Sequence, residues 1–245
     1  MPHGVKFPEL LQGLRAAPDG SIFVLHACCH NPTGVDLEPG QWDQVIEVLQ
    51  QKGHIPFLDI AYQGFGDGID ADAAVVRKFA GRPMPFLVSS SFSKSFSLYG
   101  ERVGALSMVL PTQDEAQRVL SQLKRVVRAN YSNPPTHGGA VVASVLNTPD
   151  LRSRWEEELA GMRTRIKQMR EELVKRHAAA GVRQAFSFVA RQRGRFSYSG
   201  LPSQQVDRLR EEFGIYAISS GRICVAALNP GNIGRVAEAI AKVLA

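Results

Sequence analysis

Short apolar runs alternate with helical patterns through the first half of this 245-residue chain. Three of the runs have the length of buried strands: Ile22 to Leu25, Ile55 to Ile60 and Phe86 to Ser90. A helical pattern from Pro39 to Lys52 lies between the first two. This alternation indicates βαβ units, and therefore an α/β fold with a mostly parallel sheet and flanking helices. A further strand is predicted from Arg102 to Val109.

Helical periodicity then dominates. Apolar residues recur at helical spacing from Asp114 to Val127, and a second apolar helix is predicted from Ala140 to Leu146. From Thr148 a long amphipathic helix is expected to reach about Ala180. Gly181 suits the position just after its end, where a left-handed backbone is common.

The last part of the chain predicts a smaller α+β unit. The expected strands are Ser187 to Ala190, Phe196 to Tyr198, Tyr216 to Ile218 and Ile223 to Ala226, and the expected helices are Pro202 to Phe213 and Asn232 to Leu244. We therefore predict a partial large domain over residues 1–155 and a small C-terminal domain over residues 156–245. The long helix, at about residues 150–180, lies at the boundary.

Charge and composition argue against several classes of protein. The net charge is +6, but the arginines are scattered among acidic neighbours, whereas a nucleic-acid-binding face concentrates its charge. The three cysteines fit neither a disulfide framework nor a zinc site, so we expect reduced thiols and no metal. No apolar run approaches membrane-spanning length, and the N-terminus does not resemble a secretory signal. We expect a cytoplasmic protein without membrane or nucleic-acid partners.

Polar side chains follow the first two predicted strands. Asn31 lies in His30-Asn31-Pro32-Thr33-Gly34, and Asp59 and Tyr62 stand at the end of the next strand. Open α/β sheets bind ligands at the carboxyl ends of their strands. An Asn-Pro-Thr-Gly stretch is equally consistent with an ordinary turn, and neither Asp59 nor Tyr62 alone would indicate a site.

A lysine follows the third strand within a cluster of hydroxyls. Ser91, Ser93 and Lys94 belong to this cluster, and Arg102 follows eight residues after the lysine. Hydroxyls and an arginine suit a phosphate ester. A lysine amine can bind an aldehyde covalently, and an aspartate can keep a pyridine nitrogen protonated. These are the requirements of pyridoxal phosphate, although a lone lysine is more often a solvated surface residue.

Five blocks of sequence, taken in order, resemble the class I pyridoxal-phosphate-dependent aminotransferases of the aspartate/aromatic amino-acid subgroup. They are Cys28 to Gly34, Asp59 to Phe65, Ser91 to Gly104, Arg128 to Pro135 and Ser220 to Ile223. The resemblance covers essentially the whole chain. It implies the C-terminal part of a large domain of fold type I, followed by a smaller α+β domain.

The resemblance also implies roles for single residues. Lys94 would bind the cofactor and move the proton between the substrate α-carbon and the cofactor C4′ atom. Asp59 would pair with the pyridine nitrogen, and Tyr62 and Asn31 with the phenolic oxygen. Asn31 would also contact the substrate. The cofactor phosphate would be bound by Ser91, Ser93 and Arg102. Arg222 would bind the substrate α-carboxylate through both prongs of its guanidinium, and Arg128 would reach across a homodimer interface to a distal carboxylate. Each arginine is also compatible with a surface ion pair.

The implied reaction is transamination of tyrosine, phenylalanine or aspartate with 2-oxoglutarate as amino acceptor. The chain departs from the family because three features of family members have no counterpart in it: the glycine-rich turn that binds the cofactor phosphate, an aromatic residue stacked on the pyridine ring, and a tyrosine donated across the dimer to the phosphate. We therefore expect an N-terminally truncated member. Three interpretations stay open: an active aminotransferase, a catalytically impaired fragment of one, and a basic binding module.

Overall fold

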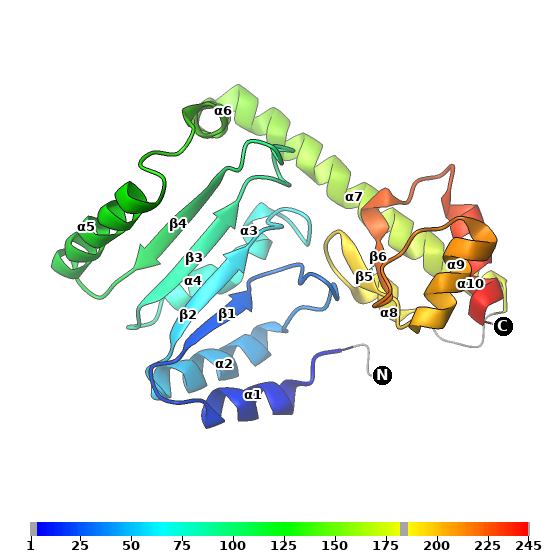
Figure 1. Ribbon diagram of the computed structural model, residues 1–245, viewed down its shortest axis with the longest axis horizontal. Coiled ribbons are helices and arrows are strands. Elements are labelled where there is room, and N and C mark those ends of the chain that lie inside the picture. The colour runs from blue at the N-terminus through cyan, green and yellow to red at the C-terminus, as the bar shows by residue number, and fades with distance from the viewer. Residues whose placement is uncertain (1–3, 182–185, 245) are drawn as a thin grey trace.

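The computed structural model describes residues 4–181 and 186–244 of the chain. A four-stranded sheet with its helices lies at one end, and a two-stranded sheet with several helices lies at the other (Figure 1). The 31-residue helix α7 (Pro149–Ala179) runs from one group to the other. The predicted boundary at residue 155 therefore falls inside a continuous helix.

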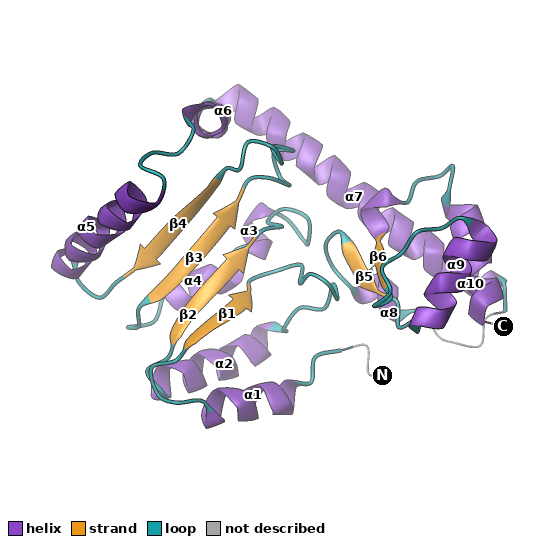
Figure 2. Ribbon diagram, in the orientation of Figure 1, coloured by secondary structure: helices purple, strands orange, loops and turns teal. Residues whose placement is uncertain are grey.

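The larger sheet has the strand order β1-β2-β3-β4 (Figure 2). Strands β1 (Ile22–His26), β2 (Ile55–Ile60) and β3 (Phe86–Ser91) are parallel. Strand β4 (Gly104–Val109) is antiparallel to β3, with Ser91 opposite Gly104. The connection between β3 and β4 contains no crossover helix, which is why the chain returns antiparallel. The mostly parallel α/β sheet predicted from the sequence is confirmed.

One face of this sheet packs against helices. The covering helices are α1 (Phe7–Ala16), α2 (Pro39–Gln51), α3 (Ile69–Asp72) and α4 (Ala74–Ala80). Aromatic rings carry much of the contact: Phe79 lies 6.2 Å from Trp42 and 5.6 Å from Phe86, measured between ring centroids. Burial of these rings stabilises the contact, since each removes about 150–250 Å² from water.

Local signals place the helix ends. Helix α2 begins with Pro39 at its first turn and with a capping box formed by Glu38 and Gln41. Helix α5 (Gln113–Asn130) begins where the Thr112 hydroxyl accepts the Glu115 N–H at 3.2 Å. Helix α6 (Thr136–Asn147) follows it, and Gly181 has φ 66° just after α7, as expected for a helix C-terminus.

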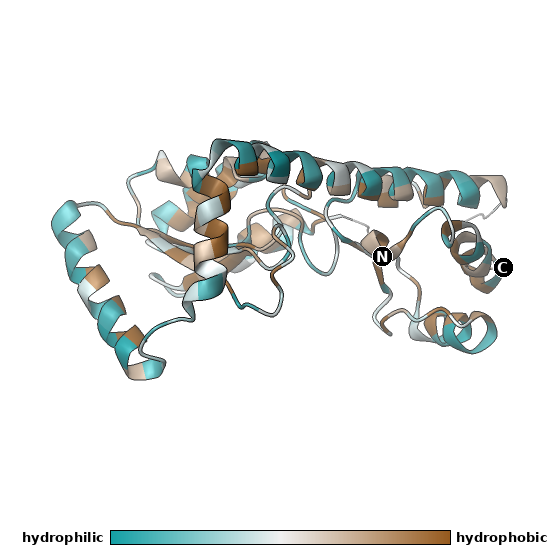
Figure 3. Cartoon of the chain, turned by 90° about the horizontal axis from the view of Figure 1, so that it is seen from above, coloured by the Kyte–Doolittle hydropathy of each residue, from teal (hydrophilic) through white to brown (hydrophobic). Residues whose placement is uncertain are grey.

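Both edge strands of the larger sheet, β1 and β4, carry exposed apolar side chains. On β1 the exposed fractions of Ile22 and Val24 are 65% and 67%, and Leu106 on β4 is 49% exposed. Helix α5 has no buried residue at all and stands away from the helices that cover the sheet (Figure 3). Within the described ranges, β1 and β4 are both unpaired on their outer edges.

The smaller group of elements packs on the C-terminal half of α7. It comprises α8 (Phe188–Arg191), β5 (Phe196–Tyr198), α9 (Ser203–Phe213), β6 (Arg222–Cys224), a 3-10 helix (Val225–Ala227) and α10 (Ile233–Leu244). Strands β5 and β6 are antiparallel, with Tyr198 opposite Arg222. None of the helices in the described ranges has both the length and the apolar character needed to cross a bilayer.

Two predicted strands in this region are wrong and a third is shorter than expected. The segment Ser187 to Ala190 lies largely in helix α8, where Phe188 and Val189 are adjacent and both buried, a pattern that an alternating strand cannot give. The segment Tyr216 to Ile218 has no strand partner, and Tyr216 is 84% exposed. The strand expected from Ile223 to Ala226 ends at Cys224, where the 3-10 helix begins.

Candidate active site

The carboxyl ends of β1, β2 and β3 bring together Asn31, Tyr62 and Lys94. Each residue lies in the segment that follows its strand, and parallel strands place these segments at one edge of the sheet. The Tyr62 side chain is buried, whereas Asn31 and Lys94 are half-buried. The sequence correctly predicts that these three residues share an edge.

Asp59 stands on β2 directly opposite Ser89 of β3. The Ser89 hydroxyl donates a hydrogen bond to Asp59 Oδ1 at 3.0 Å. A half-buried carboxylate with one oxygen engaged in this way has a defined orientation and keeps further lone pairs for another donor. The sequence does not single out Ser89, because only the pairing of β2 with β3 reveals that Ser89 lies opposite Asp59.

A chain of hydrogen bonds links Tyr62, Asn31 and Arg222. Asn31 Nδ2 donates to the Tyr62 hydroxyl at 3.4 Å, and Arg222 Nη1 donates to Asn31 Oδ1 at 3.0 Å. Burial raises the pKa of the Tyr62 phenol, and this outweighs the lowering effect of the hydrogen bond from Asn31. The phenol is therefore protonated at neutral pH in this structure and can donate a hydrogen bond.

Lys94 lies over the face of Tyr62, with its ammonium nitrogen 5.0 Å from the ring centroid. This is a cation–π contact. The Lys94 loop is fixed from behind by α7, because Trp155 Nε1 donates to the Ser95 carbonyl at 2.8 Å and the Trp155 ring stacks on Phe96 at 4.6 Å. Trp155 looks like an ordinary helix residue in the sequence, and its contact with the loop becomes visible only in the structure.

The residues expected to bind phosphate are arranged less tightly. Ser93 is buried, and its N–H donates to the Ser91 hydroxyl at 3.3 Å. Arg102 is exposed, has φ 55° and donates to the Tyr99 carbonyl at 3.0 Å. The structure therefore places the two serines together at the end of β3, while the Arg102 side chain is hydrogen-bonded to the backbone at Tyr99. Their role in phosphate binding stays a prediction.

Arg128 does not join this cluster. It is exposed near the end of α5, where its guanidinium contacts the Ser132 hydroxyl. Its predicted role requires a second copy of the chain and stays a prediction.

Phe196 connects the smaller sheet to the cluster, a role that no sequence pattern indicates. Arg222 Cζ lies 4.6 Å from the centroid of the Phe196 ring, and the Tyr62 ring meets Phe196 edge-on at 6.2 Å. Residues from β5 and β6 thus meet residues that follow β1 and β2. Arg222 reaches Asn31 because β6 pairs with β5, which itself lies against the turn after β1.

The turn that contains Asn31 is held by Asp36. Its two carboxylate oxygens accept the backbone N–H groups of Cys29 and His30 at 2.8 and 2.9 Å. His30 Nδ1 lies 2.6 Å from the Thr33 hydroxyl. Burial, and secondarily the neighbouring His26, lower the pKa of His30. A cavity of about 340 Å³ lies beside this turn, lined by His26, His30 and Trp42 among others, but Lys94, Asp59 and Tyr62 do not line it.

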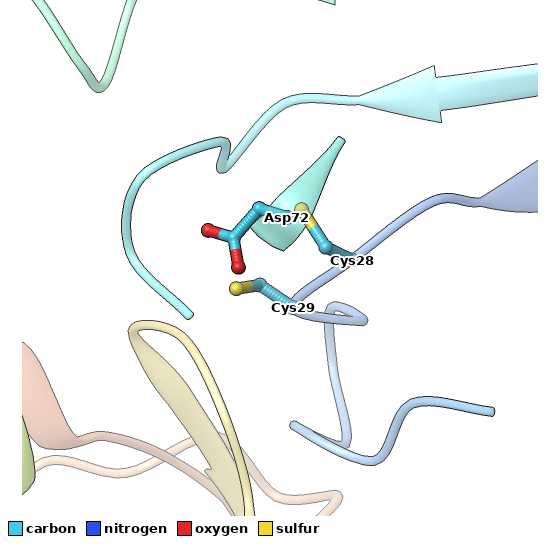
Figure 4. A group of neighbouring side chains, drawn as sticks. All are labelled: Cys28, Cys29 and Asp72. Atoms are coloured by element: carbon cyan, nitrogen blue, oxygen red, sulfur yellow. The ribbon is translucent and has the colours of Figure 1, made fainter. Parts of the chain in front are cut away.

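Cys28, Cys29 and Asp72 form a buried cluster whose ligand-type atoms lie within 4.8 Å of one another (Figure 4). The Asp72 carboxylate accepts backbone N–H groups from Gly64, Gly66 and Asp67. The hydrogen bond that the Cys29 thiol donates to Cys28, together with burial, raises the pKa of the Cys29 thiol strongly, whereas metal binding requires a thiolate. Through these contacts the cluster joins the turns that follow β1 and β2. The expectation of no metal site stays a prediction.

Comparison with known proteins places the whole chain in one family. The family model described as "Aminotransferase class I and II" matches residues 2–240. The chain is 64% identical to an aspartate aminotransferase of Pseudomonas aeruginosa and 55% identical to an aromatic-amino-acid aminotransferase of Escherichia coli. Each match covers 99% of this chain and 61% of the relative.

Solved structures that resemble this chain belong to the same kind of enzyme. A crystal structure of an aromatic-amino-acid aminotransferase from Burkholderia pseudomallei, covalently bound to pyridoxal phosphate, superposes with a TM-score of 0.98 at 65% identity. That match covers 99% of this chain and 61% of the solved chain. This chain thus spans about three fifths of the length of the relatives that it matches.

Proposed function

Because the chain belongs to the class I and II aminotransferases, we propose that it acts in the pyridoxal-phosphate-dependent transamination of aromatic or dicarboxylic amino acids. The observation that carries the proposal is the meeting of Lys94, Tyr62 and Asn31 at one sheet edge. The names of the relatives, which include aspartate, aromatic-amino-acid and tyrosine aminotransferases, support both substrate classes.

The residues present fit pyridoxal phosphate. An amine, an oriented carboxylate, a phenol and an amide lie at the ends of neighbouring strands, as its aldehyde, ring nitrogen and phenolic oxygen require. When bound, this cofactor supplies a carbonyl carbon for amines and a ring that accepts electrons from the substrate.

Lys94 is the catalytic acid and base in this proposal. Its half-buried amine holds the cofactor and moves a proton between the substrate α-carbon and the cofactor C4′ atom. Asp59, oriented by Ser89, keeps the pyridine nitrogen protonated. The Tyr62 hydroxyl and the Asn31 amide both bind the phenolic oxygen. Asn31 Nδ2 and the Tyr62 hydroxyl lie 3.4 Å apart, so both groups can reach the same atom.

Arg222 binds the substrate α-carboxylate. A guanidinium has five N–H donors in a planar fork, and the bond to Asn31 uses one of them. The Phe196 ring beneath the guanidinium fixes its plane, which favours two-pronged carboxylate recognition. Ser91, Ser93 and Arg102 would bind the phosphate, and the bond from Arg102 to the Tyr99 carbonyl uses only one of its five N–H donors.

The remaining features of the proposal concern the whole protein. We propose 2-oxoglutarate as amino acceptor, a cytoplasmic location and a homodimer in which Arg128 serves the site of the other copy. The exposed position of Arg128 on α5, outside its own cluster, supports a role across an interface.

A second candidate is a catalytically impaired fragment of such an enzyme. The observation that favours it is the exposed Arg102, whose side chain is engaged by Tyr99 at the place where phosphate binding is expected. Weak phosphate capture would lower cofactor affinity without changing the arrangement of Lys94 and Tyr62.

One experiment separates the two candidates. The protein is titrated with pyridoxal phosphate while its absorbance is recorded, and amino transfer to 2-oxoglutarate is then measured with aspartate, tyrosine and phenylalanine. Saturable binding together with turnover of at least one donor supports the enzyme. Binding without turnover, or binding only at millimolar cofactor, supports the impaired fragment. Absence of any absorbance change would contradict both.

A further inference from the structure

Arg170 is a buried cation on α7 without a carboxylate partner in the described ranges. Its exposed fraction is 2%, and none of the ion pairs found there includes it. Burial lowers the pKa of its guanidinium to about 10, so the group stays charged at neutral pH. A buried charge is costly unless its donors are satisfied, and here uncharged acceptors satisfy them.

All four acceptors of Arg170 belong to one short segment, residues 189–197. Nη1 donates to the Val189 carbonyl at 3.1 Å and to the Ser197 hydroxyl. Nη2 donates to the carbonyls of Gly194 and Phe196, both at 2.7 Å. A single guanidinium thus forms hydrogen bonds to α8, to the turn that follows it and to strand β5. No other side chain in the chain as described makes so many bonds to one segment.

This segment lies directly on the turn that carries Asn31. The Arg193 N–H donates to the Gly34 carbonyl at 2.7 Å. A Cβ atom added at Gly34 would lie 2.5 Å from the Phe196 carbonyl oxygen, and one added at Gly194 would lie 2.5 Å from Cys29 Cβ. Both glycines have positive φ, at 70° and 77°. The two turns are therefore in backbone contact, and only glycine fits at either position.

The position of Arg222 depends on this contact. Strand β6, which begins at Arg222, pairs only with β5 within the described residues, and the Arg222 guanidinium lies on the Phe196 ring. A shift of β5 away from the turn after β1 would carry Arg222 away from Asn31.

We propose that Arg170 is a positioning residue that holds β5 against the turn formed by residues 29–34 and thereby sets the place of the carboxylate-binding Arg222. The last clause rests on the proposed function. Arg170 itself touches neither substrate nor cofactor. Its four bonds fix the segment from the α7 side, while the substrate is bound on the other side.

The thiols beneath the segment report on its position without any ligand. Cys28 and Cys29 are 5% and 3% exposed, and Gly194 covers the Cys29 side chain. The third thiol, Cys224, is half-exposed and is removed by a Cys224→Ser background. Reaction of the two remaining thiols with Ellman's reagent under native conditions then measures local opening of residues 189–197.

The variants are Arg170→Met and Arg170→Lys, with Arg165→Met as the matched control. Arg165 lies on the same helix and also donates to two backbone carbonyls, those of Leu228 and Ala226 at 2.7 and 3.0 Å, but neither of these bonds goes to the segment. We expect Arg170→Met to raise the thiol reaction rate about tenfold or more, and Arg165→Met to change it by about twofold at most. Arg170→Lys, which keeps the charge but not the fork, should lie between them.

A second measurement addresses Arg222. Calorimetric titration with maleate, an unreactive dicarboxylate, in the presence of pyridoxal phosphate should show a dissociation constant about tenfold higher in Arg170→Met. The dissociation constant of pyridoxal phosphate itself, from absorbance, should change by about twofold at most, because the proposed cofactor contacts lie on or after β1, β2 and β3 and none lies in residues 189–197. A purely structural role would instead lower thermal stability and leave the ratio of the two constants unchanged.

The outcomes separate the inference from the proposed function. Unchanged thiol rates in Arg170→Met, or equal increases in Arg165→Met, would overturn the positioning role. Faster thiol reaction in Arg170→Met, combined with a parent protein that does not bind maleate, would support the positioning of β5 and count against the proposed function. Circular dichroism confirms that each variant is folded, and Arg170→Lys supplies the comparison if Arg170→Met is not.

Discussion

Arg222 and Asn31 are 191 positions apart in the sequence, yet Arg222 Nη1 donates to Asn31 Oδ1 at 3.0 Å. The bond joins the first residue of β6 to the turn after β1, and so connects the smaller sheet with the edge of the larger one. Asn31 in turn donates to Tyr62. The Asn31 amide group therefore links Arg222 to the proposed cofactor site.

Replacing Arg222 with lysine should weaken capture of amino-acid substrates. A lysine ammonium cannot provide two parallel bonds to a carboxylate, so about 1.5–3 kcal/mol of charged hydrogen bonding is lost, which lowers kcat/KM roughly 10- to 150-fold. Binding of pyridoxal phosphate should change little. Stopped-flow half-reactions with aspartate and phenylalanine measure the effect. An unaltered kcat/KM with both donors would show that the α-carboxylate is bound elsewhere.

Lys94 should be the only lysine labelled when the protein is reduced with borohydride in the presence of pyridoxal phosphate. Its amine lies over Tyr62, at the ends of the strands, whereas Lys78 is engaged by Asp43 on the surface. Peptide mapping by mass spectrometry locates the label. Lys94→Arg should abolish it and Lys78→Arg should not. A label found mainly on another lysine would contradict the assignment.

Trp155→Phe should loosen the loop that carries Lys94. The variant keeps an aromatic ring to stack on Phe96 but loses the 2.8 Å bond to the Ser95 carbonyl, which leaves that acceptor without this donor. We expect a loss of about 0.5–1.5 kcal/mol in the free energy of unfolding, measured by urea denaturation. Trp42→Phe, in the core beside Phe79, is a control that should not alter the labelling rate of Lys94. A Trp155→Phe protein with unchanged stability and labelling would show that stacking alone holds the loop.

The sequence predicts the sheet and the edge residues because both follow from local pattern. Alternating apolar runs give β1, β2 and β3, and parallel strands necessarily bring Asn31, Asp59 and Lys94 to the same edge. The family resemblance is confirmed by the match over residues 2–240. The short helices α3 and α4 were not predicted, since four and seven residues are too few for a clear periodicity.

The contacts that hold the site escaped prediction because they join distant segments. Phe196 and Trp155 look like ordinary core residues until β5 and α7 are placed beside the turn and the loop that they contact. Arg170 looks like one more basic residue on a charged helix, and only its complete burial sets it apart. The wrong strand at Ser187 to Ala190 has a similar origin, because apolar residues in a short helix and in a buried strand are alike at this length.

His177 should make the stability of the protein depend on pH. The side chain is 2% exposed near the end of α7, its ring stacks on Phe186 at 4.5 Å, and neither ring nitrogen has a hydrogen-bond partner among the described residues. Burial lowers the pKa of His177 below its ordinary value of 6.5. The unfolded chain therefore binds a proton more readily than the folded one as the pH falls below about 6.5, and stability is lost in that direction by up to about 1.4 kcal/mol per pH unit.

Replacing His177 with phenylalanine removes the titrating group and keeps a ring beside Phe186. The free energy of unfolding, measured by urea denaturation from pH 8 to pH 5, should fall less steeply below pH 6.5 in His177→Phe than in the parent protein, because the variant no longer gains a proton at this site on unfolding. Some slope should persist, since burial also lowers the pKa of His30. The control His137→Phe, at an exposed position on α6, should follow the parent curve. Parallel curves for the parent and His177→Phe would mean that the buried imidazole is protonated as readily in the folded protein as in the unfolded chain.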